Sequence, residues 1–159
     1  MAYLLQLLLG IFLSSIFIFC ICFVILQIYI KNRLNELVEK YSFYISKKIV
    51  IGFGRKHILL FDYKNHKFAL IRDYGRKINV FNFKNFVHIE EERYPLNKVC
   101  ILKHVVNIVT TKRTIVLDLS NSKTEVFSNK DYAIRNKADI IKKEFLKVKT
   151  YQNSVEQIN

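Results

Sequence analysis

The most constraining feature of this sequence is a run of uncharged, mostly apolar residues, 4–30. All 26 Lys and Arg and all 13 Asp and Glu lie beyond position 30. A helix of about 20 apolar residues crosses a hydrocarbon core about 30 Å thick, so this run has residues to spare for tilt. The sequence has no second run of this kind. It therefore predicts a single transmembrane anchor, residues 1–30.

A cleaved signal peptide is the alternative to an anchor. It needs a basic region, a shorter apolar stretch of about 7–15 residues and a small-residue cleavage site. The residues before the run are uncharged, and no Ala-x-Ala-like site follows it, so we expect an uncleaved anchor. Basic residues follow the run at once, beginning with Lys31 and Arg33. This positive-inside bias predicts an inner-membrane protein with its N-terminus outside and its bulk in the cytoplasm.

The residues after position 30 carry the whole formal net charge of +13. They are enough for one compact domain and too few for two. Two interpretations of the charge stay open. A basic domain beside an anionic leaflet gains about 1 kcal/mol for each basic side chain near the surface. Alternatively, the charge is a solvated surface that satisfies the positive-inside bias.

The apolar period predicts the organisation of this domain. Leu34, Leu37, Val38 and Tyr41 recur at helical spacing, which predicts a juxtamembrane helical extension over 31–44. From residue 45 the period shortens to two. The runs KIVIGF, HILLFDY, FALIRD, KINVFNF and FVHIEEERY are followed by VCILKHVVNIVTT, TIVLDL and TEVFS. Turn-forming Gly, Asn, Asp and Pro separate these runs, so the sequence predicts seven or eight antiparallel strands.

The period changes a last time after Ser128, which forms a capping box with Asp131. One helical face then carries Ile134, Ala138, Ile141, Phe145 and Val148. This spacing predicts an amphipathic helix that closes a cytoplasmic β domain, residues 45–150. Residues 151–159 lack a periodic face and are expected to form a flexible tail.

The sequence carries no catalytic or metal-binding motif that we can identify. The four histidines lack the spacing of a metal site, and Gly52-Phe53-Gly54 lacks the third glycine and following helix of a phosphate loop. Glu90-Glu91-Glu92 point to alternate faces of a strand, so at most two can converge, and we interpret them as a solvated strand end. We expect no enzyme activity, no cofactor and no metal.

Basic residues gather at the predicted turns. They are Lys47, Lys48, Arg55, Lys56, Arg76, Lys77, Lys112 and Arg113, here named the basic rim. If these turns share one end of the domain, the basic rim forms an anion-binding surface. Its partner could be lipid headgroups, nucleic-acid phosphates or an acidic protein, and the sequence leaves these open.

The predicted anchor carries a small-x-x-x-small pair, Gly10 and Ser14, with Gln6 one turn earlier on the same face. Such a pair lets two membrane helices approach closely, and a glutamine can form a hydrogen bond between them. The pattern allows a homodimer through the anchor. Isolated small residues are also ordinary in membrane helices, and this interpretation is the favoured one.

The expected fold class is membrane-anchored α+β. One transmembrane helix precedes a 7–8-stranded antiparallel sandwich or partly open barrel, which the C-terminal helix closes. This layout is similar to the pleckstrin-homology-like (PH-like) architecture over residues 48–149, and the stretch LLFDYKNHKFALIRDYGRKINVFNFKNFVHIEEERY looks like its meander. The resemblance implies that basic residues near the first hairpin, here Lys48, Arg55 and Lys56, contact anionic lipid.

The layout of the whole chain resembles the superinfection-exclusion proteins of temperate phages. It shares one N-terminal inner-membrane span, a small basic cytoplasmic domain and a composition typical of AT-rich coding DNA, as in prophages. The resemblance implies a non-catalytic protein that blocks injection of a related phage's DNA at the inner membrane. Incoming phage ejection proteins or DNA would then be its partners. A membrane-tethered PH-like adaptor that binds anionic lipid or a protein is the alternative.

Overall fold

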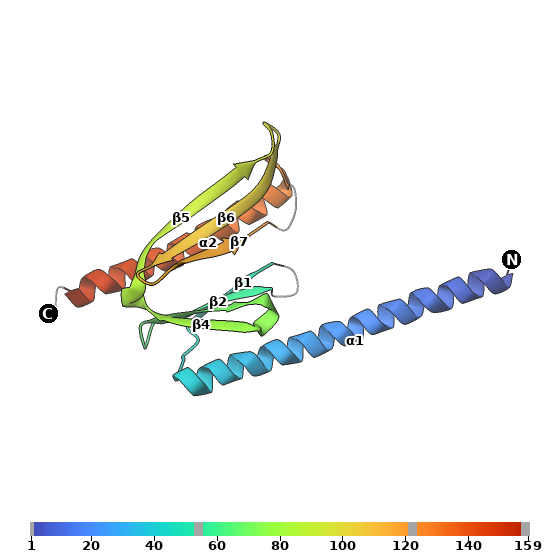
Figure 1. Cartoon of the computed structure of the whole chain (residues 1–159), viewed down its shortest axis with the longest axis horizontal. Helices are drawn as coiled ribbons and strands as arrows, with labels where there is room; N and C mark the ends of the chain where they lie inside the picture. Colours follow the sequence, from blue (N-terminus) through green and yellow to red (C-terminus); the bar gives the residue numbers. More distant parts are fainter. Residues whose placement is uncertain (1, 53–55, 121–123, 157–159) are drawn as a thin grey trace. The chain divides into compact units, whose positions relative to one another are not determined.

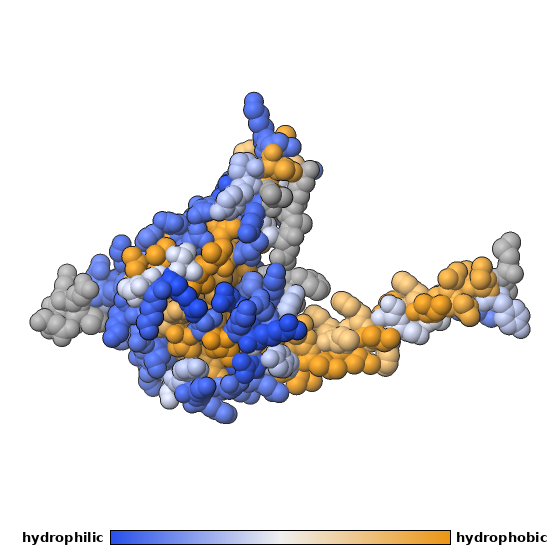
Figure 2. Space-filling model, in the orientation of Figure 1, coloured by the Kyte–Doolittle hydropathy of each residue, from blue (hydrophilic) through white to orange (hydrophobic). Residues whose placement is uncertain are grey.

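The computed structural model describes residues 2–52, 56–120 and 124–156, and the chain divides into two units, Met1–Ser42 and Phe43–Asn159 (Figure 1). The first unit is the helix α1, Ala2–Tyr41. Its stretch Tyr3–Tyr41 is long and apolar enough to cross a membrane, and its surface is largely hydrophobic (Figure 2). The helix ends three residues before the predicted position 44, because Ser42 adopts a left-handed backbone conformation with φ of 48°.

The second unit begins with a four-stranded antiparallel sheet in the order β1-β2-β3-β4. Its strands are β1 (Lys47–Ile51), β2 (His57–Asp62), β3 (Lys67–Arg72) and β4 (Lys77–Asn82). The short 3-10 turn η2 (Asp73–Gly75) joins β3 to β4. These strands confirm the predicted meander as far as β4.

A second antiparallel sheet follows the 3-10 turn η3, Phe83–Asn85, where the chain leaves the first sheet. It contains β5 (Phe86–Pro95), β6 (Cys100–Thr110) and β7 (Thr114–Asp118), and the two-residue β8 (Thr124–Glu125) pairs with the start of β6. The described strands thus form two separate sheets, and they do not close into a barrel.

The helix α2, Asn129–Glu156, completes the second unit, and Figure 1 shows it running along the second sheet. The predicted N-cap is confirmed at its start, since Ser128 Oγ accepts a hydrogen bond from the backbone N–H of Asp131 at 3.2 Å, while Asp131 Oδ2 accepts from the backbone N–H of Phe127 rather than that of Ser128. The C-terminal end of α2 lies beyond the predicted position 150. Residues 151–156 are helical, because Tyr151 packs on Tyr63 with ring centroids 5.5 Å apart and Gln152 donates hydrogen bonds to backbone carbonyls of the turn and strand nearby.

The hydrophobic core lies between the two sheets and α2. From α2 it includes Ala138, Ile141, Phe145 and Val148, all fully buried, as the helical spacing predicts, whereas Ile134 on the same predicted face is only partly buried. From the first sheet it includes one face of each strand, for example Leu59, Phe61, Phe68 and Leu70. The residues that alternate with these on β2 and β3, namely Ile58, Leu60, Ala69 and Ile71, are buried as well. Burial of both faces explains why these two strands read as continuous apolar runs.

Candidate functional site

The strand register brings three members of the basic rim together. His57 pairs with Ile51 and Arg72 pairs with Lys77, so Lys56, Arg76 and Lys77 lie at one end of the first sheet. The backbone N–H of Tyr74 donates to the carbonyl of Lys56 at 3.1 Å, which joins the two turns. Lys56 is partly buried, whereas Arg76 and Lys77 are exposed. We name Lys56, Arg76 and Lys77 the basic end.

The surroundings of the basic end shift the pKa of His57. Burial and then the positive charge of Lys56 lower the pKa of this imidazole below its usual range. The exposed pair between Lys77 Nζ and Asp73 Oδ2, 3.6 Å apart, neutralises one of the cations only weakly in water. Because Arg76 and Lys77 are exposed, the basic end presents a positive potential toward solvent.

The rest of the basic rim lies elsewhere. Lys47 and Lys48 pair with Phe61 and Leu60, so they lie at the opposite end of the first sheet. The two ends lie four positions apart along β1, a distance of about 13 Å. The turns therefore do not all share one end of the domain, as a single anion-binding surface would require. Arg55 lies outside the described residues.

Arg113, in the turn between β6 and β7, packs against the first sheet. Its guanidinium donates a hydrogen bond to Asn79 Oδ1 and lies 5.3 Å from the centroid of the Phe81 ring. Nearby, the backbone N–H of Thr111 donates to the carbonyl of Asn85 at 2.8 Å. These contacts hold the β6–β7 turn against the other sheet, so Arg113 has a structural role, although Arg113 and its neighbour Lys112 are both exposed.

The candidate residues of α1 keep their predicted places on the helix. Ser14 Oγ donates to the carbonyl of Gly10 at 2.7 Å, within one turn. A Cβ added at Gly10 would meet nothing within 4 Å, so the face that also carries Gln6 has room for a close neighbour. Beyond the apolar run, Arg33 forms an ion pair with Glu36, and Lys31 is exposed.

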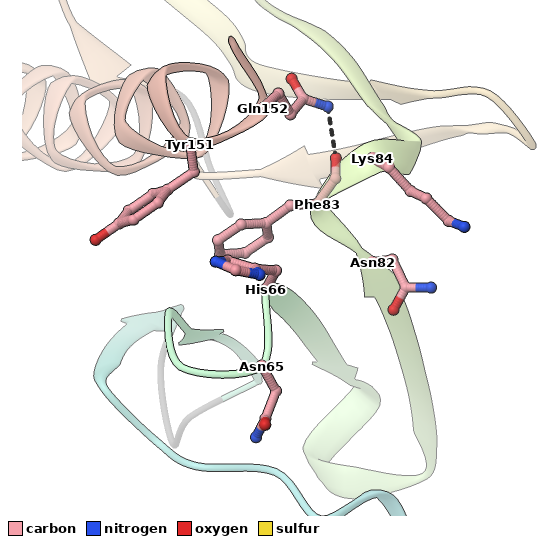
Figure 3. Close-up of a pocket in the computed structure, with 7 residues that line it drawn as sticks. All are labelled: Asn65, His66, Asn82, Phe83, Lys84, Tyr151 and Gln152. Atoms are coloured by element: carbon pink, nitrogen blue, oxygen red, sulfur yellow. Dashed lines mark hydrogen bonds between the residues drawn. The ribbon is translucent and has the colours of Figure 1, made fainter. Parts of the chain in front are cut away.

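A pocket of about 310 Å³ lies where the β2–β3 turn, η3 and the end of α2 meet (Figure 3). Its lining residues are Asn65, His66, Asn82, Phe83, Lys84, Tyr151 and Gln152. The rings of His66, Phe83 and Tyr151 form an aromatic wall with centroids 5.8 to 6.2 Å apart. Gln152 Nε2 donates to the carbonyls of Phe83 and Phe86 at 2.7 and 2.9 Å, which joins α2 to η3.

Sequence reasoning misses this pocket, because its walls come from three segments far apart in the chain. One of these segments, around Tyr151, falls in the predicted flexible tail. Aromatic walls with a few polar groups are typical of sites for small ligands or for a partner's side chain. The chain offers no local motif for such a site, since each wall is an ordinary turn or helix end by itself.

Ionisable side chains converge between the second sheet and α2. Glu91 Oε1 lies 2.6 Å from His104 Nε2, and Glu91 Oε2 accepts a hydrogen bond from Lys142 Nζ. Burial alone would raise the pKa of Glu91, but hydrogen bonds from Lys142 and His104 outweigh it and lower this pKa to about 2. The predicted alternation of the three glutamates is confirmed. The interpretation of a solvated strand end is wrong for Glu91, whose side chain is only 16% exposed.

The cluster around Glu91 has a structural role. The Glu91 carboxylate contacts three cationic or hydrogen-bonding partners, His104, Lys142 and Arg93, which leaves a paired carboxylate rather than a free base. Within the described ranges, no group of three or more His, Cys, Asp and Glu side chains could hold a metal ion. Comparisons with family models, with curated proteins and with solved structures found no match to this chain.

Proposed function

We propose that this chain is a membrane-tethered binding protein without catalytic activity. It crosses the inner membrane once, with its N-terminus outside and its domain in the cytoplasm. The observation that carries this proposal is α1, whose stretch Tyr3–Tyr41 is long and apolar enough to span a bilayer while all the charge follows position 30. A tether of this kind keeps a weakly binding domain at high effective concentration beside the membrane.

We propose superinfection exclusion as the biological role. The domain would contact the ejection proteins or the DNA of an incoming related phage where these cross the inner membrane. The exposed cations of the basic end support this role, because grouped Lys and Arg side chains attract phosphates and acidic surfaces without any need for a catalytic group.

A membrane-tethered PH-like adaptor is the second candidate. Two antiparallel sheets, β1–β4 and β5–β7, followed by a closing helix form the element order that the resemblance implies. The resemblance also implies that Lys48, Arg55 and Lys56 contact anionic lipid. Lys48 and Lys56 lie at opposite ends of the first sheet, and Arg55 lies outside the described residues.

The topology predicts the outcome of C-terminal fusions. A fluorescent protein fused after Asn159 is expected to fluoresce in intact cells, and an alkaline phosphatase fusion is expected to be inactive, because the basic flank of α1 retains the domain in the cytoplasm. The two reporters are measured in parallel at matched expression. An active phosphatase fusion with a dark fluorescent fusion would reverse the proposed orientation.

The exclusion role predicts that the full chain, expressed in a susceptible host, blocks DNA injection by a related phage while adsorption stays normal. Potassium efflux and intracellular phage DNA are measured during challenge. Replacing Arg76 and Lys77 with Glu is expected to restore injection, because these exposed cations contribute little to stability but most of the local potential. Lys143→Glu with Lys149→Glu, an equal charge change on exposed positions of α2, is the matched control.

Normal injection by every related phage would remove the exclusion role and favour the adaptor. Loss of exclusion in both charge-reversed variants would show that total charge, rather than the basic end, carries the activity. Membrane fractionation of each variant accompanies the assay, so that a failure of anchoring is seen separately.

A further inference from the structure

Exposed apolar side chains gather at the far end of the second sheet. The β5–β6 hairpin tip, residues 94–99, presents Tyr94, Leu96 and Val99, of which Leu96 is 50% and Val99 63% exposed. The backbone N–H of Val126 donates to the carbonyl of Val99 at 2.7 Å, so the segment that carries Phe127, 69% exposed, runs beside the tip. The hairpin projects away from the rest of the second unit in Figure 1, and hydrophobic and hydrophilic residues lie side by side at this end in Figure 2.

The hairpin tip is an ordered turn. The backbone N–H groups of Leu96 and Asn97 both donate to the carbonyl of Cys100, at 3.0 and 3.3 Å. Asn97 Oδ1 in turn accepts from the backbone N–H groups of Val99 and Cys100, at 3.0 and 2.8 Å. These bonds satisfy the backbone locally and hold the apolar side chains outward. A partner surface therefore gains contacts with the tip at little cost in loop ordering.

We propose that the β5–β6 hairpin tip inserts into the interfacial layer of an anionic membrane. The tip is convex, and a fluid lipid surface accommodates a convex apolar wedge without a matching pocket. Tyr94 has the amphipathic ring that favours the headgroup level. Lys98 is exposed and has no ion-pair partner among the described residues, so its ammonium can reach lipid phosphates while its stem lies along the apolar layer.

This inference rests on the proposed tethering and adds a second membrane contact to it. Insertion of the tip would orient the domain on the leaflet, and the tether makes such a weak contact effective by holding the tip near lipid.

The sequence contains no tryptophan, so a single introduced tryptophan reports on its own surroundings. The full chain carrying Leu96→Trp or Val99→Trp is reconstituted in phosphatidylglycerol vesicles with brominated acyl chains, which quench a nearby indole. We expect a blue-shifted emission and quenching about twofold stronger than for Val116→Trp, an exposed site on β7. Val116 pairs with Asn107, about 24 Å along β6 from Cys100.

Three further measurements decide among the outcomes. Phosphatidylcholine vesicles, or the added change Lys98→Glu, should weaken quenching at position 96, because the contact uses anionic headgroups. If the tryptophans at positions 96 and 99 are quenched no more strongly than the tryptophan at position 116, the proposed insertion is wrong. A signal that grows with the protein-to-lipid ratio would also overturn it, by showing a protein surface at the tip. Phe17→Trp, in the middle of α1, tests the tether separately, since its quenching is required whether or not the tip inserts.

Discussion

The Phe145→Ala variant is expected to lose about 3–5 kcal/mol of unfolding free energy. Phe145 lies fully buried on α2, and its ring meets three others from both sheets. The ring centroids of Phe61, Phe68 and Phe86 lie 5.1, 5.2 and 4.8 Å away. Alanine would remove the ring that joins the two sheets to the helix and leave a cavity that close-packed aromatic neighbours cannot fill. Since whole domains are stable by only about 5–15 kcal/mol, much of the population could unfold.

Urea unfolding of the full chain in detergent micelles, followed by far-UV circular dichroism, measures this loss. The neighbouring Leu146→Ala is the matched control, because Leu146 is 60% exposed and its removal creates no cavity. The control is expected to change the unfolding free energy by less than about 0.5 kcal/mol. Equal losses in the two variants would contradict the placement of Phe145 at the centre of the core.

The Glu91→Gln variant is expected to lose about 2 kcal/mol at neutral pH, and this loss should vanish in acid. Each pKa unit is worth about 1.4 kcal/mol, and solvent screening at this partly open pair reduces the full contribution to about 2 kcal/mol. The pKa of Glu91 falls from its ordinary value of 4.5 to about 2 in the folded chain. A depressed carboxyl pKa contributes stability above the unfolded value, and this contribution is lost as the pH falls toward the folded value.

The difference in unfolding free energy between the natural chain and Glu91→Gln is therefore constant above about pH 5 and declines toward pH 2. The same micelle assay, repeated across this range, measures it. Glu90→Gln removes the same charge from the exposed face of β5, where Glu90 Oε1 lies 2.8 Å from His88 Nε2, and should stay within about 0.5 kcal/mol at every pH. A loss in Glu91→Gln that persists undiminished at pH 2 would show that packing, rather than the charge of Glu91, is responsible.

Local signals in the sequence were sufficient for most elements of the fold. The period of two from residue 45 and the turn residues predict the strands that are observed, because each depends on neighbours within a few positions. The start of α2 likewise follows from Ser128 and Asp131, because Ser128 Oγ caps the backbone N–H of Asp131. The buried face from Ala138 to Val148 follows from the helical spacing alone.

The candidate sites were less predictable, because they depend on which segments meet. The sequence allows the basic rim to form one surface if its turns share one end of the domain. The strand register instead separates Lys47 from Lys56 by the length of a strand. The exposed hairpin tip reads as an ordinary turn around Pro95. The sequence predicts a frayed end for α2, because the ring that Tyr151 packs against, Tyr63, lies in the β2–β3 turn, far away in the sequence.

The sequence by itself determined the apolar run, the uneven charge and the alternation of strands with a final helix, since these follow from residue type and spacing along one chain. Only the tertiary structure decided that Glu91 is paired with Lys142 and His104, that Arg113 packs across to Phe81, and that an aromatic pocket forms around Phe83. The physical reason is that burial and pairing depend on contacts between distant segments. A side chain's own type does not specify which partner will reach it.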